Sequence, residues 1–379
     1  MPPSHGHYNL ECDVRHVYHA YTPLPLQAIS PLAIDDELSS WLIEAHRLLG
    51  KLDGMYCYIP DMNILAYPLA KHESGFSCEL EILEALYNER FHAEPLKTAT
   101  DKITDVYSDA LLHYKKLSSA KESTVLDFIR NIHRQMFIDE YHDAGQFRTT
   151  QLFSYPKATA LNGHPIYNPP HPKEMLTTIE ALSDYIDAPS ELDPLIQIAL
   201  VYYQLATIRP FLIGNGLTER MCVNYLLVET GMLPRPLLCL SEHLLASDAE
   251  YRDALRLVRD GFRGYEVWIK FFLKIVIIAA EKTAKMLDEI HELRASDLAK
   301  LYSCGKCSPL LLALYEHLWQ SPIIEARNMT TVLNASYNTI AKAIDTLCYF
   351  DILGQTDAKA RYRKFGYKNL LDTLHYTSE

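Results

Sequence analysis

The chain has 379 residues, a net charge of −12, and ordinary fractions of hydrophobic (48%) and charged (22%) residues. A single hydrophobic core rarely exceeds roughly 250–300 residues, so more than one domain is expected. The composition excludes wholesale disorder, and the acidic charge excludes a chain that binds polyanions over its whole surface.

The sequence lacks the patterns of export and membrane insertion. No basic segment followed by an apolar one opens the chain, and the most apolar run, residues 267–280, is short and contains two lysines. Eight scattered cysteines favour a reducing compartment, and the lone Cys304–Cys307 pair lacks the second ligand pair of a zinc site. The sequence therefore predicts a cytoplasmic protein without membrane contact and without a metal site.

Helical periodicity dominates the chain after an N-terminal stretch, rich in Pro, His and Tyr, that predicts an extended arm. Apolar residues recur at helical spacing over residues 39–52, 121–136 and 173–301, and residues 296–309 are predicted as a linker. Residues 145–172 are rich in Thr, Tyr, Phe, Gly and Pro, which predicts a hairpin or extended flap. The fold class expected is mainly α with a short β-hairpin flap.

A loop between two predicted helices has the composition of an anion site. An apolar helix over residues 193–208 leads into the Gly214-Asn215-Gly216 turn, and a second helix starts at residue 217. Glycines let backbone N–H groups point in one direction, and the helix dipole adds positive potential. A plain interhelical turn is the alternative, and this turn alone does not decide between the two.

The segment from Arg209 to Arg220 resembles the signature of the Fic domain, His-Pro-Phe-x-x-Gly-Asn-Gly-Arg-x-x-Arg. The similarity covers about residues 38–300 and includes these further segments: Glu44-Ala45-His46-Arg47, Leu52-Asp53-Gly54, Gly145-Gln146-Phe147-Arg148, Tyr202-Tyr203-Gln204 and Pro236-Leu237-Leu238. Together with the pattern of the two ends, the resemblance predicts four regions: an N-terminal arm (1–35), an N-terminal helical region with an inhibitory helix (36–120), a Fic-like helical core (121–300) and a C-terminal module (301–379).

The resemblance also implies a chemistry, the transfer of AMP or a related phosphoryl group from a nucleotide to a protein hydroxyl (AMPylation). In such proteins the signature His is the general base, and an acidic residue after the Phe holds Mg²⁺. The Gly-Asn-Gly turn and two arginines hold the phosphates, and the flap pairs with the target protein as an added strand.

This chain keeps only part of the signature. The matching residues are Pro210, Phe211, Gly214, Asn215, Gly216 and Arg220. Arg209 replaces the His, Ile213 replaces the acidic residue and Leu217 replaces the first Arg. A guanidinium stays protonated up to a pKa above about 12, so Arg209 cannot accept a proton at neutral pH. Because Ile213 also offers Mg²⁺ no oxygen, we predict a pseudoenzyme that does not use Mg²⁺.

Ligand binding without chemistry is the leading hypothesis for this loop. The predicted site consists of Phe211, Gly214, Asn215, Gly216 and Arg220 beside the fixed charge of Arg209, and its ligand is ATP, ADP or another phosphate anion. In one alternative, Arg209 pairs with a local carboxylate and the loop holds no ligand. In another, the chain is an active nucleotidyltransferase of altered mechanism.

Residues 77–81 resemble the self-inhibitory helix of the family, Ser/Thr-x-x-x-Glu-Gly/Asn, whose Glu pairs with the second signature arginine. Ser77 and Glu81 match this pattern, and Ile82 replaces the Gly. The resemblance therefore predicts a contact between Glu81 and Arg220. The alternative is that Glu81 is an exposed carboxylate.

Residues 301–379 predict a winged helix-turn-helix module. Helices are expected over residues 309–319, 323–333 and 337–350, with Ser336 capping the third, and a two-stranded wing follows over 355–367. The module carries 8 Lys and Arg against 7 Asp and Glu, a net charge of +1, which leaves −13 for the rest of the chain.

The basic residues of this module gather in the wing, where a winged helix meets the DNA backbone. The residues expected at duplex DNA are Tyr337, Asn338, Thr339, Lys342, Lys359, Arg361, Arg363 and Lys364. Protein docking or dimerisation is the alternative role. We expect a regulatory protein whose partners are a target protein at the flap and duplex DNA at the module. A third hypothesis is a transcriptional regulator whose core only forms a homodimer.

Overall fold

The computed structural model describes residues 5–12, 17–29, 32–55, 59, 64–66, 68–76, 102–109, 124–139, 141–153, 160–161, 164–165, 167–236, 238–261, 263–303, 307–356 and 363–374. Contacts divide the chain into two compact units. The first unit comprises residues 1–50 and 70–281, and the second comprises residues 51–69 and 282–379.

The N-terminal stretch of the first unit forms a β-hairpin. Strand β1 (Gly6–Cys12) pairs antiparallel with β2 (Val17–Pro23), with Gly6 opposite Pro23. Tyr21 of β2 is fully buried, and its backbone N–H donates to the carbonyl of Asn168 at 2.9 Å. The inner face of β2 therefore belongs to the core of this unit.

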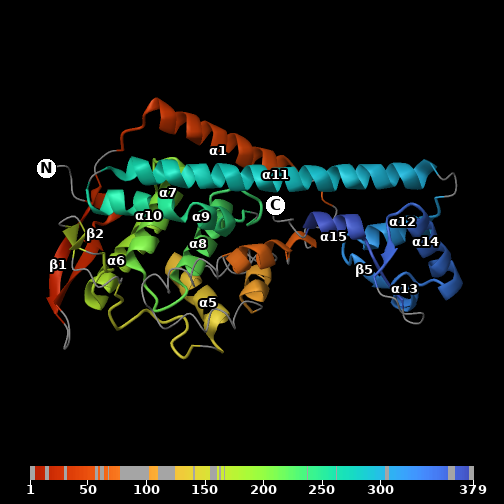
Figure 1. The fold of residues 1–379 in the computed structure, drawn as a ribbon, viewed down its shortest axis with the longest axis horizontal. Coiled ribbons are helices and arrows are strands. Elements are labelled where there is room, and N and C mark those ends of the chain that lie inside the picture. Colours follow the sequence, from red (N-terminus) through yellow and green to blue (C-terminus); the bar gives the residue numbers. More distant parts are fainter. Residues whose placement is uncertain are drawn as a thin grey trace. The chain divides into compact units, whose positions relative to one another are not determined.

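Helices form the rest of the first unit (Figure 1). They are η1 (Leu26–Ala28), α5 (Val125–Phe137), α6 (Pro172–Asp187), α7 (Pro194–Ile208), α8 (Asn215–Glu229), α9 (Ser241–Ala246), α10 (Asp248–Arg259), a helical segment over residues 102–109 and, from residue 70 onward, a helical segment over residues 68–76. Two further helices, α1 (Asp36–Met55) and α11 (Tyr265–Ser303), begin in this unit and end in the second. Strands β3 (Ala160–Leu161) and β4 (His164–Pro165) form the short hairpin predicted for the flap. The prediction of a mainly helical fold with a short hairpin is confirmed.

Helix α7 is the central helix of the first unit. Asp193 caps it by accepting the N–H of Leu195, and every residue from Leu195 to Ile208 except Gln197 is buried. The Trp268 indole of α11 donates to the carbonyl of Ala199 at 2.6 Å, which satisfies the polar atom of this large, fully buried side chain. This packing fixes α7, and with it the loop that follows.

The second unit contains the end of α11, which continues through Ser303. The predicted linker over 296–309 is therefore wrong for residues 296–303. Asp297 and Leu301 are fully buried, and a carboxylate oxygen of Asp297 accepts the hydroxyl of Tyr367. Burial of this last turn keeps the helix intact. No helix in the described part of the chain, α11 included, combines the length and apolarity that a membrane span needs.

The remaining elements of the second unit are α12 (Pro309–His317), β5 (Ile323–Glu325), α13 (Ala326–Val332), α14 (Tyr337–Tyr349), β6 (Gly354–Gln355), β7 (Lys364–Gly366) and α15 (Lys368–Leu374). The strands form an antiparallel sheet in the order β5-β7-β6. The predicted helix over 323–333 thus begins as a strand, because Ile324 pairs with Phe365. Ser336 caps α14 by accepting the N–H of Thr339, as expected.

Candidate functional site

The segment that joins α7 to α8 reverses the chain at two left-handed residues. Arg209 ends α7 with φ 50° and ψ 68°, and its backbone N–H donates to the carbonyl of Leu205 at 2.9 Å. Gly214 has φ 65° and precedes the first turn of α8. Every residue from Arg209 to Arg220 is buried except Leu212, which is half-buried. The loop is therefore a fixed part of the core, and α8 begins inside it.

The Asn215 side chain closes this loop on itself. Its Oδ1 accepts the Phe211 N–H at 2.9 Å, and its Nδ2 donates to the Phe211 carbonyl at 2.8 Å. Both ends of the amide are used in this way, and Asn215 is 1% exposed. The side chain therefore shapes the loop.

His133 supports the same loop from α5. Its Nε2 donates to the carbonyl of Ile213 at 3.0 Å, and its Nδ1 accepts the N–H of Gly145 at 2.8 Å. Its ring also stacks on Phe211, with centroids 3.9 Å apart. Burial lowers the pKa of His133 to about 4, so the imidazole is neutral at pH 7 and suited to one donor and one acceptor contact.

Arg148 holds the backbone on both sides of the loop. Its guanidinium donates to the carbonyls of Arg209 at 2.9 Å, Pro170 at 2.6 Å and Thr150 at 3.2 Å. Its backbone N–H donates to the carbonyl of Pro210 at 2.8 Å. Arg148 is 3% exposed, so these contacts lie in the protein interior, where they anchor the start of the flap to the end of α7.

Arg220, in the second turn of α8, lies beside a buried carboxylate. Its Nε is 4.0 Å from the Oε1 of Glu73, which belongs to the helical segment of residues 68–76. Glu73 also accepts the Ser241 hydroxyl at 2.6 Å and the Ser241 N–H at 3.0 Å. The same carboxylate thus connects α8 to the first turn of α9.

The replaced signature positions differ in chemistry. Arg209 is 8% exposed and carries a permanent positive charge, while Ile213 is 6% exposed and presents only hydrocarbon. Neither side chain offers an oxygen to a metal ion or a base to a hydroxyl. The two glycines of the turn are both buried at the start of α8, where the resemblance places a phosphate chain.

The other predicted site residues lie apart from this loop. Ser77, Glu81 and Arg361 fall outside the described residues. In the second unit, Tyr337, Asn338 and Lys342 of α14 are exposed on one face, and Arg363 and Lys364 are exposed at β7. The opposite face of α14 consists of the predicted inward residues, Ile340, Ala343, Ile344 and Leu347, all of which are buried.

Sequence reasoning missed three residues that shape the site: His133, Arg148 and Glu73. His133 carries a weak signal, because it is a polar residue next to the apolar face of a predicted helix. Arg148 was included only as part of the flap. Glu73 carries no local signal, because its contact depends on how segments distant in the chain pack together.

Comparison with known proteins identifies the domain that contains this loop. The sequence profile of the Fic/DOC family matches residues 123–227, which contain α5, α6, α7 and most of α8. This part of the chain is a Fic/DOC domain. The Fic domain thus contributes His133, Arg148, the buried loop and Arg220, whereas Glu73 comes from outside the matched residues.

Curated relatives are similar over this region. A "Protein adenylyltransferase Fic" of Nematostella vectensis is 32% identical over 121 residues, which cover 31% of this chain and 26% of that protein. The Drosophila willistoni protein of the same name is 28% identical over 149 residues, which cover 37% of this chain and 28% of that protein. The chain therefore spans about a quarter of the length of these relatives.

A solved structure extends the similarity of fold beyond the Fic domain. The Fic family protein from Desulfovibrio desulfuricans G20 aligns over 89% of this chain and 98% of its own, with a TM-score of 0.52. At 14% sequence identity this similarity concerns the fold alone.

Proposed function

We propose that the Fic domain binds a nucleotide or another phosphate anion at the first turn of α8 and does not transfer AMP by a Mg²⁺-dependent route. The observation that carries this proposal is a loop whose backbone is held in place while its chemically active side chains are replaced. Its backbone is held by Asn215, His133 and Arg148, while the positions for the base and the metal ligand hold Arg209 and Ile213. The names of the relatives, protein adenylyltransferases, support a nucleotide as the ligand.

Binding is supported by the electrostatics of α8. The first turn of a helix has N–H groups without partners inside the helix, and its macrodipole amounts to roughly half a positive charge. Arg220 lies in the second turn, so a guanidinium reinforces this potential. Glu73 opposes it, because its carboxylate lies 4.0 Å from Arg220. A phosphate ligand would therefore compete with Glu73 for this guanidinium.

Loss of ordinary transfer is supported by the chemistry of the replaced residues. Removal of a general base costs about 10²–10⁴ in rate, and Arg209 cannot supply this function at neutral pH. The buried Ile213 provides no ligand for a hard cation, which prefers oxygen. For ATP bound at this loop, no base would activate the acceptor hydroxyl of a target protein, and Ile213 would hold no metal ion.

Calorimetric titration of ADP and ATP into the full chain tests the binding proposal. We expect saturable binding in EDTA, with an affinity that changes little when Mg²⁺ is added. Arg220→Gln should weaken binding, whereas the control Arg252→Gln, at a partly exposed arginine paired with Asp248 on α10, should not. Absence of binding at millimolar nucleotide to the unaltered chain would refute the proposal.

The alternative of an active transferase is tested with ATP labelled at the α-phosphate. The unaltered chain should leave no covalent label on itself or on added protein extract. The triple variant Arg209→His, Ile213→Asp and Leu217→Arg restores the signature residues and serves as the comparison. Covalent label produced by the unaltered chain would favour the alternative.

We propose DNA binding as a second function, carried by the second unit. The supporting observation is the division of α14 into a buried apolar face and an exposed face with Tyr337, Asn338 and Lys342. Tyr337 is 52% exposed, although it is a large aromatic side chain. A helix that exposes polar and aromatic residues in its first turns, in a unit that also exposes the basic residues Arg363 and Lys364 at β7, is typical of a winged helix that reads a groove.

Binding of the full chain to duplex DNA over a series of salt concentrations tests this function. We expect affinity to fall as salt rises, because phosphate contacts release counterions. The double variant Lys342→Gln and Lys364→Gln should weaken binding and reduce the salt dependence. The control Lys51→Gln and Lys285→Gln removes the same charge from other helices. Equal behaviour of the two double variants would contradict specific docking through α14.

A further inference from the structure

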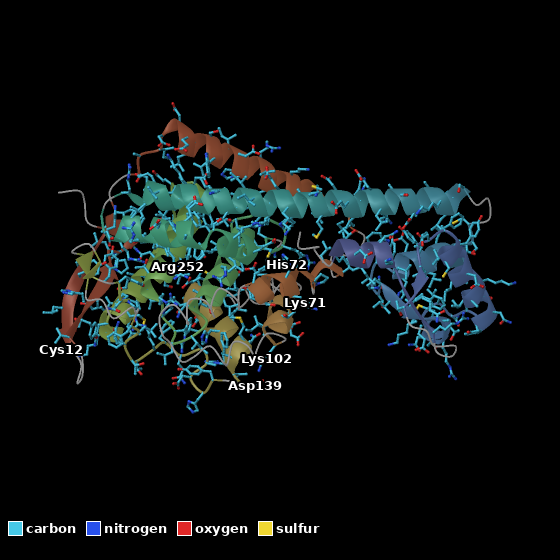
Figure 2. The ribbon with its side chains drawn as sticks, in the orientation of Figure 1. Cys12, Lys71, His72, Lys102, Asp139 and Arg252 are labelled. Carbon is cyan, nitrogen blue, oxygen red and sulfur yellow. The ribbon has the colours of Figure 1, made fainter. Side chains whose placement is uncertain are left out.

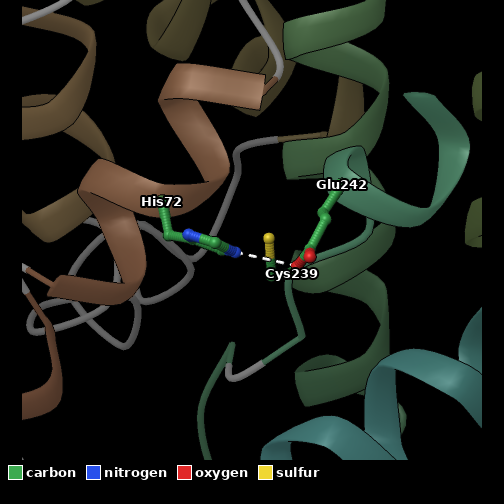
Figure 3. A group of neighbouring side chains, drawn as sticks. All are labelled: His72, Cys239 and Glu242. Atoms are coloured by element: carbon green, nitrogen blue, oxygen red, sulfur yellow. Dashed lines mark hydrogen bonds and ion pairs between the residues drawn. The ribbon is translucent and has the colours of Figure 1, made fainter. Parts of the chain in front are cut away.

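Three side chains of different chemistry converge beside the Fic domain (Figure 3). His72 projects from the helical segment of residues 68–76, Cys239 precedes α9, and Glu242 belongs to the first turn of α9. One ligand atom of each lies within 4.8 Å of the other two: a His72 ring nitrogen, the Cys239 Sγ and a Glu242 carboxylate oxygen. Figure 2 places His72 next to Lys71 on the same segment.

We propose that His72, Cys239 and Glu242 bind a divalent transition-metal ion, and that Zn²⁺ fits them best. An imidazole, a thiolate and a carboxylate are the ligands that zinc takes in proteins, and three protein ligands leave one position for water. The sulfur ligand disfavours Mg²⁺ and Ca²⁺, which prefer oxygen throughout. All three residues lie outside residues 123–227, so none of them belongs to the phosphate site proposed for the Fic domain.

The geometry requires only small movements of the side chains. A tetrahedral site with bonds of about 2.0–2.3 Å separates its ligand atoms by roughly 3.3–3.7 Å. The His72 Nε2 and the Glu242 Oε2 are now 2.8 Å apart and share a hydrogen bond. The ion would replace this hydrogen bond. It would move the two atoms about half an ångström further apart and draw the Cys239 Sγ inward by up to about an ångström.

The three side chains differ in their exposure to solvent, which gives the ion a way in. Cys239 is 3% exposed, whereas the His72 and Glu242 side chains are 12% and 21% exposed. The thiol therefore forms the closed end of the site, and the imidazole and carboxylate form its accessible end. On binding, the Cys239 thiol loses its proton to solvent as the Sγ–metal bond forms. The His72 nitrogen and the Glu242 oxygen exchange their mutual hydrogen bond for bonds to the metal, and the ion releases bound water.

The surrounding charges favour a cation. Glu73, next to His72 in the chain, is buried beside Cys239, so the site has a second carboxylate close to its thiol. The Nε of the Arg220 guanidinium lies 4.0 Å from the Oε1 of Glu73. A divalent ion would therefore be placed among two carboxylates and a thiolate, with one compensating arginine.

Such an ion would connect two segments that are distant in the chain. His72 and Glu73 belong to one helical segment, whereas Cys239, Ser241 and Glu242 lie at the start of α9. The ion would link them through His72, next to the hydrogen bonds that Glu73 already makes with Ser241. Metal binding is thus expected to stabilise the packing that holds Glu73 against Arg220.

Titration of Co²⁺ into the metal-free full chain tests the proposal. Co²⁺ substitutes for Zn²⁺ and reports a sulfur ligand by a charge-transfer absorption in the near ultraviolet. We expect this band to saturate at one equivalent and to disappear when Zn²⁺ is added. Cys239→Ser should abolish the band, whereas the control Cys222→Ser, at another buried cysteine, should keep it. His72→Gln and Glu242→Gln should each weaken binding about 10-fold or more.

Two results would overturn the proposal. One is the absence of stoichiometric metal uptake by the unaltered chain, a measurement that does not depend on the folding of any variant. The other is an unchanged charge-transfer band in Cys239→Ser, which would assign the metal to other cysteines. Because nucleotide binding is measured separately in EDTA, failure of either proposal leaves the other one standing.

Discussion

The Oε1 of Glu73 lies 4.0 Å from the Nε of Arg220, and both side chains are 4% exposed. A buried arginine needs a counter-charge, because removal from water costs several kcal/mol per ion. Glu73 supplies this charge and at the same time binds the first residue of α9 through the Ser241 hydroxyl and N–H. The carboxylate thus links three helical segments at the edge of the proposed phosphate site.

Removal of the Glu73 carboxylate should destabilise the first unit. Glu73→Ala leaves Arg220 and Ser241 without this partner, and we expect a loss of about 3–5 kcal/mol in the free energy of unfolding. Glu73→Gln keeps the acceptor for Ser241 and should cost less. Denaturant unfolding measures both, with Glu250→Gln on α10 as an exposed control. Equal stability of Glu73→Ala and the control would contradict the structural role assigned to this carboxylate.

Lysine should not be able to replace the forked guanidinium of Arg148. Arg148→Lys keeps the charge but cannot reach the carbonyls of Arg209, Pro170 and Thr150 together. We expect a loss of about 2–4 kcal/mol, since each unsatisfied buried polar group costs about 1–3 kcal/mol. Arg252→Lys on α10 is the matched control, and its effect should stay below about 1 kcal/mol. Similar unfolding curves for the two variants would show that the charge of Arg148, rather than its shape, holds the loop.

Gly214 should tolerate no side chain. Its φ is 65°, and a Cβ there would lie 2.3 Å from the Cε2 of Phe137. Gly231→Ala is an informative control, because Gly231 has φ 73° and nothing within 4 Å of its added Cβ. Backbone strain of about 1–2 kcal/mol applies to both, and overpacking adds about 1–3 kcal/mol at Gly214 alone. Unfolding measurements that find equal losses would mean that Phe137 moves aside freely.

His133 should make stability depend on pH on the acid side. Burial lowers the pKa of His133 to about 4, below the value of about 6.5 in an unfolded chain. The folded state therefore favours the neutral ring, so this stabilisation is complete above pH about 6.5 and is lost as pH falls toward 4. The stabilisation that the lowered pKa of His133 provides at pH 7 is about 3 kcal/mol.

Stability measured between pH 4 and 8 checks this prediction. His133→Gln should flatten the decline relative to the unaltered chain, although it lowers stability at pH 7. His142→Gln, which removes an exposed imidazole, should leave the decline in place. A decline of the same size in His133→Gln would assign the pH dependence to other groups.

The sequence was most informative where local rules apply. Apolar spacing predicted the helices that became α1, α5, α7 and α14, and the Ser336 cap follows from local hydrogen bonding. The sequence predicts a linker from residue 296, whereas α11 continues to Ser303 because Asp297 and Leu301 are buried, with the Asp297 carboxylate accepting the Tyr367 hydroxyl. Strand β5 was missed for a similar reason, since its pairing with β7 involves residues far along the chain.

In the candidate site too, local features follow from the sequence and contacts between distant segments do not. Gly214, Asn215 and Gly216 could be placed at the start of a helix from the sequence, but the binding of both ends of the Asn215 amide to Phe211 could not. The contact of Arg220 with Glu73 and the convergence of His72, Cys239 and Glu242 depend on packing between distant segments. No single-sequence pattern specifies such packing.

One filter-binding experiment distinguishes a Fic domain that holds a nucleotide without transferring AMP from a Fic domain that transfers it. The full chain is incubated with ATP labelled at the α-phosphate and collected either under native conditions or after denaturation. We expect saturable label on the native protein that disappears completely on denaturation. Label that survives denaturation, or no label on the native protein at millimolar ATP, would contradict it.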